Sequence, residues 1–154
     1  MSFVKNTEWS GVTGSQFEEE FISIAKMRVT WNGEYIPYRR SMDLIRRNQE
    51  PSSALCENGI KFRDAIAEHL NVDIEEVRVY GSLHTCLDEK HGVDMFVDFR
   101  GMTITIDLTL NPQKAGYKAD VIVGKEDVRN GFVLAADRVA YAIRSASSRP
   151  SIHA

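Results

Sequence analysis

The strictest alternation of hydrophobic and polar residues lies between residues 93 and 110. Positions that share one face in its first half are apolar, namely Val93, Met95, Val97 and Phe99. The same holds in its second half, for Met102, Ile104, Ile106, Leu108 and Leu110. Because successive strand side chains point to opposite faces, the pattern predicts two amphipathic strands joined at Arg100-Gly101.

The turn between these strands decides which side chains face each other. A two-residue turn at Arg100-Gly101 pairs Phe99 with Met102 and, further out, Asp94 with Asp107. A bulged turn would set apolar side chains against polar ones, which a half-buried sheet resists. We therefore predict the two-residue turn, with the two aspartates as neighbours on the face opposite the apolar one.

Weaker patterns predict the remaining elements. Apolar residues at helical spacing predict helices over 16–27, 58–70 and 127–146, the first of which opens with a capping box of Ser15 and Glu18. Short apolar runs predict strands near 77–80 and 119–123, and Asn32-Gly33 predicts the turn of a hairpin over 29–36. We expect a single domain over 1–154, with a helix, the hairpin and a basic segment in 1–56 and a core in 57–146. The fold class is α+β or α/β, with a central mixed β-sheet flanked by helices.

The composition, with 43% apolar and 27% charged residues, is that of a soluble globular protein. A net charge of -3 excludes a global positive field for nucleic acid, so DNA contact has to use a local patch. The basic cluster lies in segment 38–47, where a helix would bring arginines three, four and seven residues apart onto one face. We take its arginines as nucleic-acid-binding candidates: Arg39, Arg40, Arg46 and Arg47. Trp31 and Tyr35 lie nearby in the sequence and could stack on bases.

No segment approaches the roughly 20 apolar residues of a membrane span, and residues 1–20 carry no apolar signal core. Two cysteines, Cys56 and Cys86, are too few for a disulfide scaffold, so we expect reduced thiols. These features predict a cytoplasmic protein without membrane contact. A homo-oligomer is compatible with them.

The paired aspartates are the main candidate chemistry. Cross-strand neighbours have Cβ atoms roughly 4.5 to 5.5 Å apart, so ionised Asp94 and Asp107 would repel each other unless a cation or a proton lies between them. Carboxylate oxygens suit Mg²⁺ or Mn²⁺, and such an ion activates water and stabilises charge on a phosphoryl oxygen. The pair therefore predicts a metal-dependent phosphodiesterase.

The segment Gly92-Val93-Asp94, followed by a hairpin and by Ile106-Asp107-Leu108-Thr109, resembles the core of the PD-(D/E)XK nuclease superfamily in its RecB-like form. The resemblance implies a restriction endonuclease-like core over 57–146 and a hydrolase that cuts DNA with Mg²⁺ or Mn²⁺. It implies that Asp94 is the first metal ligand, Asp107 the second, and the carbonyl of Leu108 a further one. Thr109 stands where the family pattern has lysine, so activity would be weakened or lost unless Lys114 or Lys118 supplies the charge. Glu57 or Glu68 could add a ligand from a helix.

Other interpretations stay open. Asp and Thr on one face are also typical of a solvated antiparallel sheet. A noncatalytic protein that binds nucleic acid or protein would keep the fold, use the arginines for its partner and lack the lysine. Gly81-Ser82 followed by acids resembles nucleotidyltransferases, although Phe96 stands where an Asp-x-Asp motif has its second acid. His84, Cys86 and His91 lie within eight residues but lack a fourth ligand for structural zinc.

Overall fold

A computed structural model describes residues 11–111 and 118–147 of the chain. Its centre is one four-stranded sheet in the order β1-β2-β3-β4. The strands are β1 (Arg78–Gly81), β2 (Met95–Phe99), β3 (Met102–Leu108) and β4 (Val121–Val123). β2 is antiparallel to both of its neighbours, whereas β4 is parallel to β3. The sheet is therefore mixed, as the sequence predicts.

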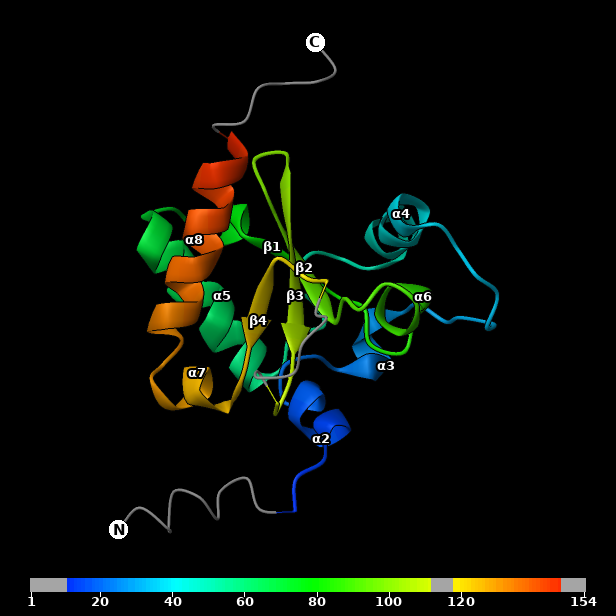
Figure 1. Cartoon of the computed structure of the whole chain (residues 1–154). Helices are drawn as coiled ribbons and strands as arrows, with labels where there is room; N and C mark the ends of the chain where they lie inside the picture. Colours follow the sequence, from blue (N-terminus) through cyan, green and yellow to red (C-terminus); the bar gives the residue numbers. More distant parts are fainter. Residues whose placement is uncertain (1–10, 112–117, 148–154) are drawn as a thin grey trace.

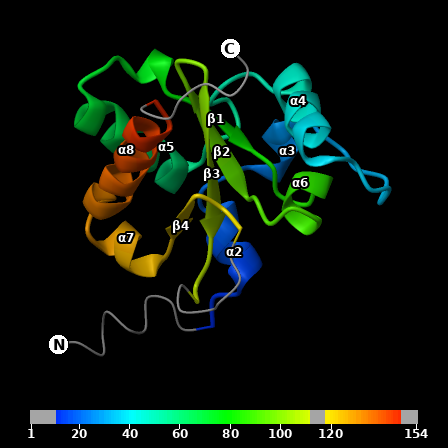
Figure 2. The ribbon, with the colours of Figure 1, turned by 45° about the horizontal axis from the view of Figure 1, so that its top comes forward.

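Helices cover both faces of this sheet (Figures 1 and 2). On one side lie α5 (Glu57–Leu70) and α8 (Val133–Ser147), with α7 (Lys125–Arg129) beside α8. On the other side lie α3 (Ile24–Met27), α4 (Tyr38–Asn48) and α6 (Cys86–Glu89). The short helix α2 (Gly14–Glu19) lies at one end of the sheet, and a 3-10 turn, η1 (Ile74–Glu76), precedes β1. No helix of the described part is long and apolar enough to cross a membrane.

The hairpin of β2 and β3 has the predicted register. Phe99 pairs with Met102 and Val97 pairs with Ile104. Arg100 and Gly101 both have positive φ, of 48° and 81°, which is the backbone of a two-residue type I′ turn. The regular pairing ends at Met95 and Ile106, and Asp94 N–H donates to the same Ile106 carbonyl at 3.0 Å.

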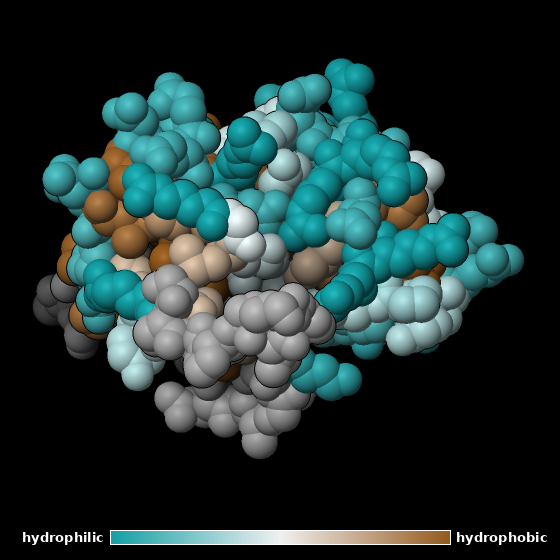
Figure 3. All heavy atoms as spheres, turned by 90° about the horizontal axis from the view of Figure 1, so that it is seen from above, coloured by the Kyte–Doolittle hydropathy of each residue, from teal (hydrophilic) through white to brown (hydrophobic). Residues whose placement is uncertain are grey.

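Each sheet face has its own hydrophobic core. The larger core joins the apolar face of β2, β3 and β4 to α5 and α8, and includes Phe62, Ile106 and Phe132. The smaller core lies between the opposite face and α4, and includes Ile45, Tyr80, Leu87 and Phe96. Figure 3 shows the molecule from above, with hydrophilic side chains gathered over the α4 side.

The N-terminal helix of the sequence prediction is broken in two. Thr13 and Gln16 form the capping box of α2 instead of Ser15 and Glu18, and α2 ends at Glu19. The chain then runs extended, because Ile22 forms an isolated antiparallel bridge with Leu55. The apolar residues of this segment could reach the core from one continuous helix or from a helix followed by an extended residue. Their spacing does not distinguish between these two conformations.

A close backbone approach fixes this junction. A Cβ atom built on Gly59 of α5 would lie 2.3 Å from the Phe21 carbonyl oxygen, a contact that no side chain tolerates. Cys56 N–H donates to the same oxygen at 2.8 Å. Glycine therefore allows the chain leaving α2 to lie directly on the start of α5.

Two further predictions need correction. Residues 29–36 form no strand, so the predicted hairpin is wrong; Asn32 Oδ1 accepts from Glu34 N–H within a loop. The C-terminal helix predicted over 127–146 is interrupted between α7 and α8, where Gly131 and Phe132 have positive φ of 72° and 68°. In both cases local turn geometry overrides the longer pattern.

Candidate metal centre

The two predicted aspartates meet at one end of the hairpin. Asp94 precedes β2 and Asp107 lies near the end of β3, and their side chains are within hydrogen-bonding reach of each other. Asp94 is only 2% exposed. One of its carboxylate oxygens accepts from the Leu108 backbone N–H at 2.7 Å. The structure thus brings together the pair that the sequence predicts.

Two further acids, which the sequence analysis did not assign to the site, complete the cluster. Asp88 of α6 and Glu18 of α2 both raise the pKa of Asp94, Asp88 more strongly. Asp107 in turn acts on Glu18. Four carboxyl groups from four different segments therefore lie near one another, and we call Glu18, Asp88, Asp94 and Asp107 the acid cluster, although no three of them have ligand atoms within 4.8 Å of one another.

The acid cluster shifts the pKa of its own members. Burial, followed by hydrogen bonds with Asp107 and Asp88, raises the pKa of Asp94 far above the usual range of a carboxyl group. Burial, followed by the charges of Asp88 and Asp107, raises the pKa of Glu18 to about 7. The side chains that raise the pKa of Asp94 most are themselves acidic. The cluster therefore holds protons at neutral pH unless a cation takes their place.

Three members of the cluster, Glu18, Asp88 and Asp107, line a cleft of about 630 Å³, whereas Asp94 is buried behind them. The lining of the cleft includes Asp107 with Leu108, Thr109 in the motif-lysine position, and Lys118. Lys118 is exposed at the rim, whereas Lys114 lies outside the described residues. Glu57 and Glu68 are exposed on α5 and do not line this cleft, whose helical glutamates are Glu18 of α2 and Glu89 of α6.

Asp88 also belongs to a second group of possible ligands. The ligand atoms of His84, Asp88 and Glu89 all lie within 4.8 Å of one another, the one such trio among the described residues. The zinc combination weighed from the sequence is not assembled, since Cys86 Sγ accepts from the Ile36 backbone N–H at 3.2 Å and His91 Nε2 lies 2.9 Å from the Ile36 carbonyl. His84 instead faces acids.

The candidate nucleic-acid residues of α4 separate into two groups. Arg39, Arg40 and Arg47 are exposed on the helix surface. Arg46 turns inward and makes a bidentate pair with Asp98, with Nε–Oδ2 and Nη2–Oδ1 distances of 2.7 and 3.0 Å. It also donates to Thr103 at 2.9 Å. Arg46 is therefore engaged in holding α4 on the sheet.

The glycine-serine turn after β1 is closed. Ser82 is fully buried, and its hydroxyl donates to the Val93 carbonyl at 2.6 Å. A Cβ on Gly81 would lie 2.3 Å from Ile22 Cγ2. This turn presents no hydroxyl to a phosphate group.

Family models, curated proteins and solved structures were each compared with the chain, and none of them matches it. The functional argument therefore depends on the residues themselves.

Proposed function

We propose that the chain is a metal-dependent phosphodiesterase that acts on DNA, with the acid cluster as its Mg²⁺ or Mn²⁺ site. The observation that carries the proposal is the buried Asp94 carboxyl group, whose side-chain neighbours Asp107 and Asp88 are both acids. Burial beside other acids disfavours the ionised form of Asp94, and a divalent cation that replaced its proton would relieve this cost. The resemblance to PD-(D/E)XK nucleases supports the same assignment.

Asp94 and Asp107 would hold the ion, with the Leu108 carbonyl as a further oxygen ligand. The bound ion would supply a water of lowered pKa and would stabilise charge on a phosphoryl oxygen. Glu18 has a pKa of about 7, which suits it to accept a proton from the attacking water near neutral pH. Lys118, at the rim of the cleft, would offer positive charge to the phosphate.

The DNA backbone would lie across α4 and the cleft. Arg39, Arg40 and Arg47 are exposed there and offer a local positive surface on a chain whose net charge is -3. Arg46 is excluded from this role because its guanidinium is paired with Asp98. Single Arg39→Ala and Arg40→Ala variants should each reduce the salt dependence of DNA binding by about one counterion.

A noncatalytic binding protein is the second candidate, and the observation that favours it is Thr109 in the cleft at the place of the motif lysine. Such a protein would bind DNA through α4 and would not cleave it. The nucleotidyltransferase alternative has less support, since buried Ser82 offers no hydroxyl to a triphosphate.

The decisive experiment combines cleavage with metal binding. Wild-type protein should nick plasmid DNA with Mn²⁺, and Asp94→Asn and Asp107→Asn should each abolish nicking. Glu18→Gln should lower the rate by about 10²-fold or more, whereas Glu19→Gln, its exposed neighbour on α2, should leave the rate unchanged. Equal rates for these two glutamate variants would contradict the role of Glu18.

Calorimetric titration with Mn²⁺ separates the two candidates. Binding should release about one or two protons, seen as a heat that depends on the ionisation enthalpy of the buffer, because the ion displaces protons from Asp94 and Glu18. Mn²⁺ binding without cleavage would favour the noncatalytic protein. Absence of Mn²⁺ binding would refute the metal centre.

A further inference from the structure

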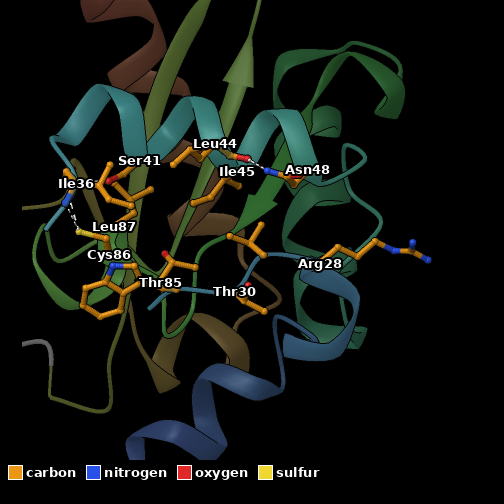
Figure 4. A pocket seen from close by; sticks show the side chains of 12 residues that line it. Arg28, Thr30, Ile36, Ser41, Leu44, Ile45, Asn48, Thr85, Cys86 and Leu87 are labelled. Carbon is orange, nitrogen blue, oxygen red and sulfur yellow. Dashed lines mark hydrogen bonds between the residues drawn. The ribbon is translucent and has the colours of Figure 1, made fainter. Parts of the chain in front are cut away.

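A second hollow lies beside α4 and the start of α6 (Figure 4). It has a volume of about 170 Å³ and is enclosed by α4, by the loop that replaces the predicted hairpin, and by the first residues of α6. None of the residues that line it lines the cleft of the acid cluster. We call it the α4–α6 cavity.

The walls and size of the α4–α6 cavity suit one flat ring. Ile36, Leu44, Ile45 and Leu87 supply apolar surface. Trp31 supplies an aromatic side chain, which is held in place because its indole N–H donates to the Glu34 carbonyl at 2.6 Å. Pockets for drug-sized ligands measure roughly 300 to 1,000 Å³, and an engineered apolar cavity of about 150 Å³ holds benzene. The α4–α6 cavity is therefore the right size for a single ring.

Three polar side chains of the cavity, those of Ser41, Asn48 and Thr85, each donate a hydrogen bond within the protein. Ser41 Oγ donates to the Ile36 carbonyl at 3.1 Å, and Thr85 Oγ1 donates to the Ser82 carbonyl at 2.6 Å. Asn48 Nδ2 donates to the Leu44 carbonyl at 2.7 Å. A hydroxyl has one proton and two lone pairs, and an amide oxygen accepts two bonds. The cavity therefore offers acceptors and favours a ring that carries N–H donors.

We propose that the α4–α6 cavity binds a single-ring heterocycle with an exocyclic amino group, the chemistry of cytosine. The ring would lie between the Trp31 indole and the apolar wall, with its amino group turned to the oxygens of Ser41, Thr85 and Asn48. Arg28 also lines the cavity, and its guanidinium points outward (Figure 4), where a phosphate attached to the nucleoside would lie.

Two sources could supply this base, a free nucleotide or a nucleotide of a DNA strand. Thr85, Cys86 and Leu87 line the cavity, while Asp88 and Glu89 of the same helix line the cleft. A base bound in the cavity would therefore contact the helix that carries one acid of the cluster. The proposal does not rest on the proposed function, because it concerns binding in the absence of metal.

Tryptophan fluorescence offers a direct test, since the chain has only two tryptophans. In a Trp9→Phe background, Trp31 reports alone. Metal-free titration with dCMP should change its fluorescence in a saturable way, and dUMP, which presents a carbonyl in place of the amino group, should bind at least about 10-fold more weakly, a difference of about 1.4 kcal/mol. Equal affinities for the two nucleotides, or no response to dCMP, would overturn the proposal without any variant in the cavity.

A variant that fills the cavity provides the second test. Leu44→Phe should abolish the dCMP response, whereas Leu134→Phe, at an exposed position of α8, should leave it unchanged. A dCMP response that survives Leu44→Phe in a folded protein would place the binding elsewhere.

A competition experiment then identifies the source. A thymidine oligonucleotide with one central cytosine should displace dCMP at lower concentration than free dCMP if the strand supplies the base. The reverse order would identify a free nucleotide, and either order supports the assigned chemistry. Displacement by an all-thymidine oligonucleotide at the same concentration would contradict it.

Discussion

The sheet face that packs against α4 has an acid near each of its two ends, and the two acids have opposite surroundings. Asp98 lies in β2 opposite Thr103 of β3, and Asp94 lies four residues earlier, just before β2. At the Asp98 end, Arg46 makes a bidentate pair and also bonds Thr103. At the Asp94 end, the neighbours are Asp107, Asp88 and Glu18.

Asp98 stabilises the fold through its ion pair, whereas we propose that Asp94 binds a cation. Asp98 is compensated within the chain, so its charge helps to hold α4 on the sheet. Asp94 is more deeply buried and is compensated by protons, which a divalent cation can replace. The burial and raised pKa of Asp94, more than the number of acids, are what distinguish this end from the Asp98 end.

The largest expected effect is on the cleavage rate, and it comes from adding a positively charged side chain near Asp94. Thr109→Lys places an amine in the cleft at the motif position, and it should raise Mn²⁺-dependent cleavage by about 10²-fold by stabilising charge on the phosphoryl group. Rates of plasmid nicking measure this. Thr109→Gln, a side chain of similar length without charge, is the control. Equal rates for both variants would argue against a missing electrostatic group.

The next largest effect is on stability, and it comes from removing the arginine that pairs with Asp98. Arg46→Ala removes the bidentate pair, the bond to Thr103 and the packing of the guanidinium 5.1 Å from the centre of the Phe96 ring. The free energy of unfolding should fall by about 2 kcal/mol. Urea denaturation measures it. Arg47→Ala, on the exposed side of the same helix, should change it by less than about 0.5 kcal/mol.

Replacing aspartate by asparagine should change the melting temperature in opposite directions at positions 98 and 94. Asp98→Asn weakens the pair with Arg46 and should lower the melting temperature of the metal-free protein. Folding at pH 8 has to protonate Asp94, whereas Asp94→Asn needs no proton and keeps an oxygen for the Leu108 N–H, so it should raise that temperature by about 2 to 4 °C for each kcal/mol of this cost. Thermal melts at pH 8 in the presence of a chelator compare them. A fall for both variants would show that the Asp94 carboxylate is compensated after all.

The smallest effect is a dependence of stability on pH. Asp94 and Glu18 have raised pKa values in the folded protein, so their protonated forms favour folding below the unfolded pKa of about 4, and this contribution is lost as the pH rises through the folded pKa, about 7 for Glu18. The melting temperature of the metal-free protein should therefore fall between pH 5 and 8 more steeply for wild type than for Glu18→Gln. Saturating Mn²⁺ should cancel or reverse this difference, and Glu19→Gln should follow wild type.

The hairpin could be predicted because alternation and turn chemistry specify the same register. The apolar face of β3 admits one pairing with β2, and Arg100-Gly101 adopts the turn that this pairing requires. The proximity of Asp94 and Asp107 follows from that register. Their burial does not, since it depends on α2 and α6 packing over them.

Glu18 and Asp88 could not be assigned because their contacts join distant segments. The pattern placed Glu18 in a capping box, a role that acids and hydroxyls near helix starts commonly take. Its one available signal is its position one residue after Phe17 and three before Phe21, both of them buried, which sets a charge beside the apolar side of α2. Asp88 has no comparable signal, because α6 is a four-residue helix whose place depends on α4.

The position of Glu18 in the acid cluster depends on Gly59, a residue of α5 outside the cluster. The segment that carries Glu18 crosses α5 at a place where even one added methyl group would collide with the Phe21 carbonyl oxygen. A search for inactive variants should therefore recover substitutions at this glycine, and their loss of activity would come from displacement of a carboxylate that lies forty-one residues earlier in the chain.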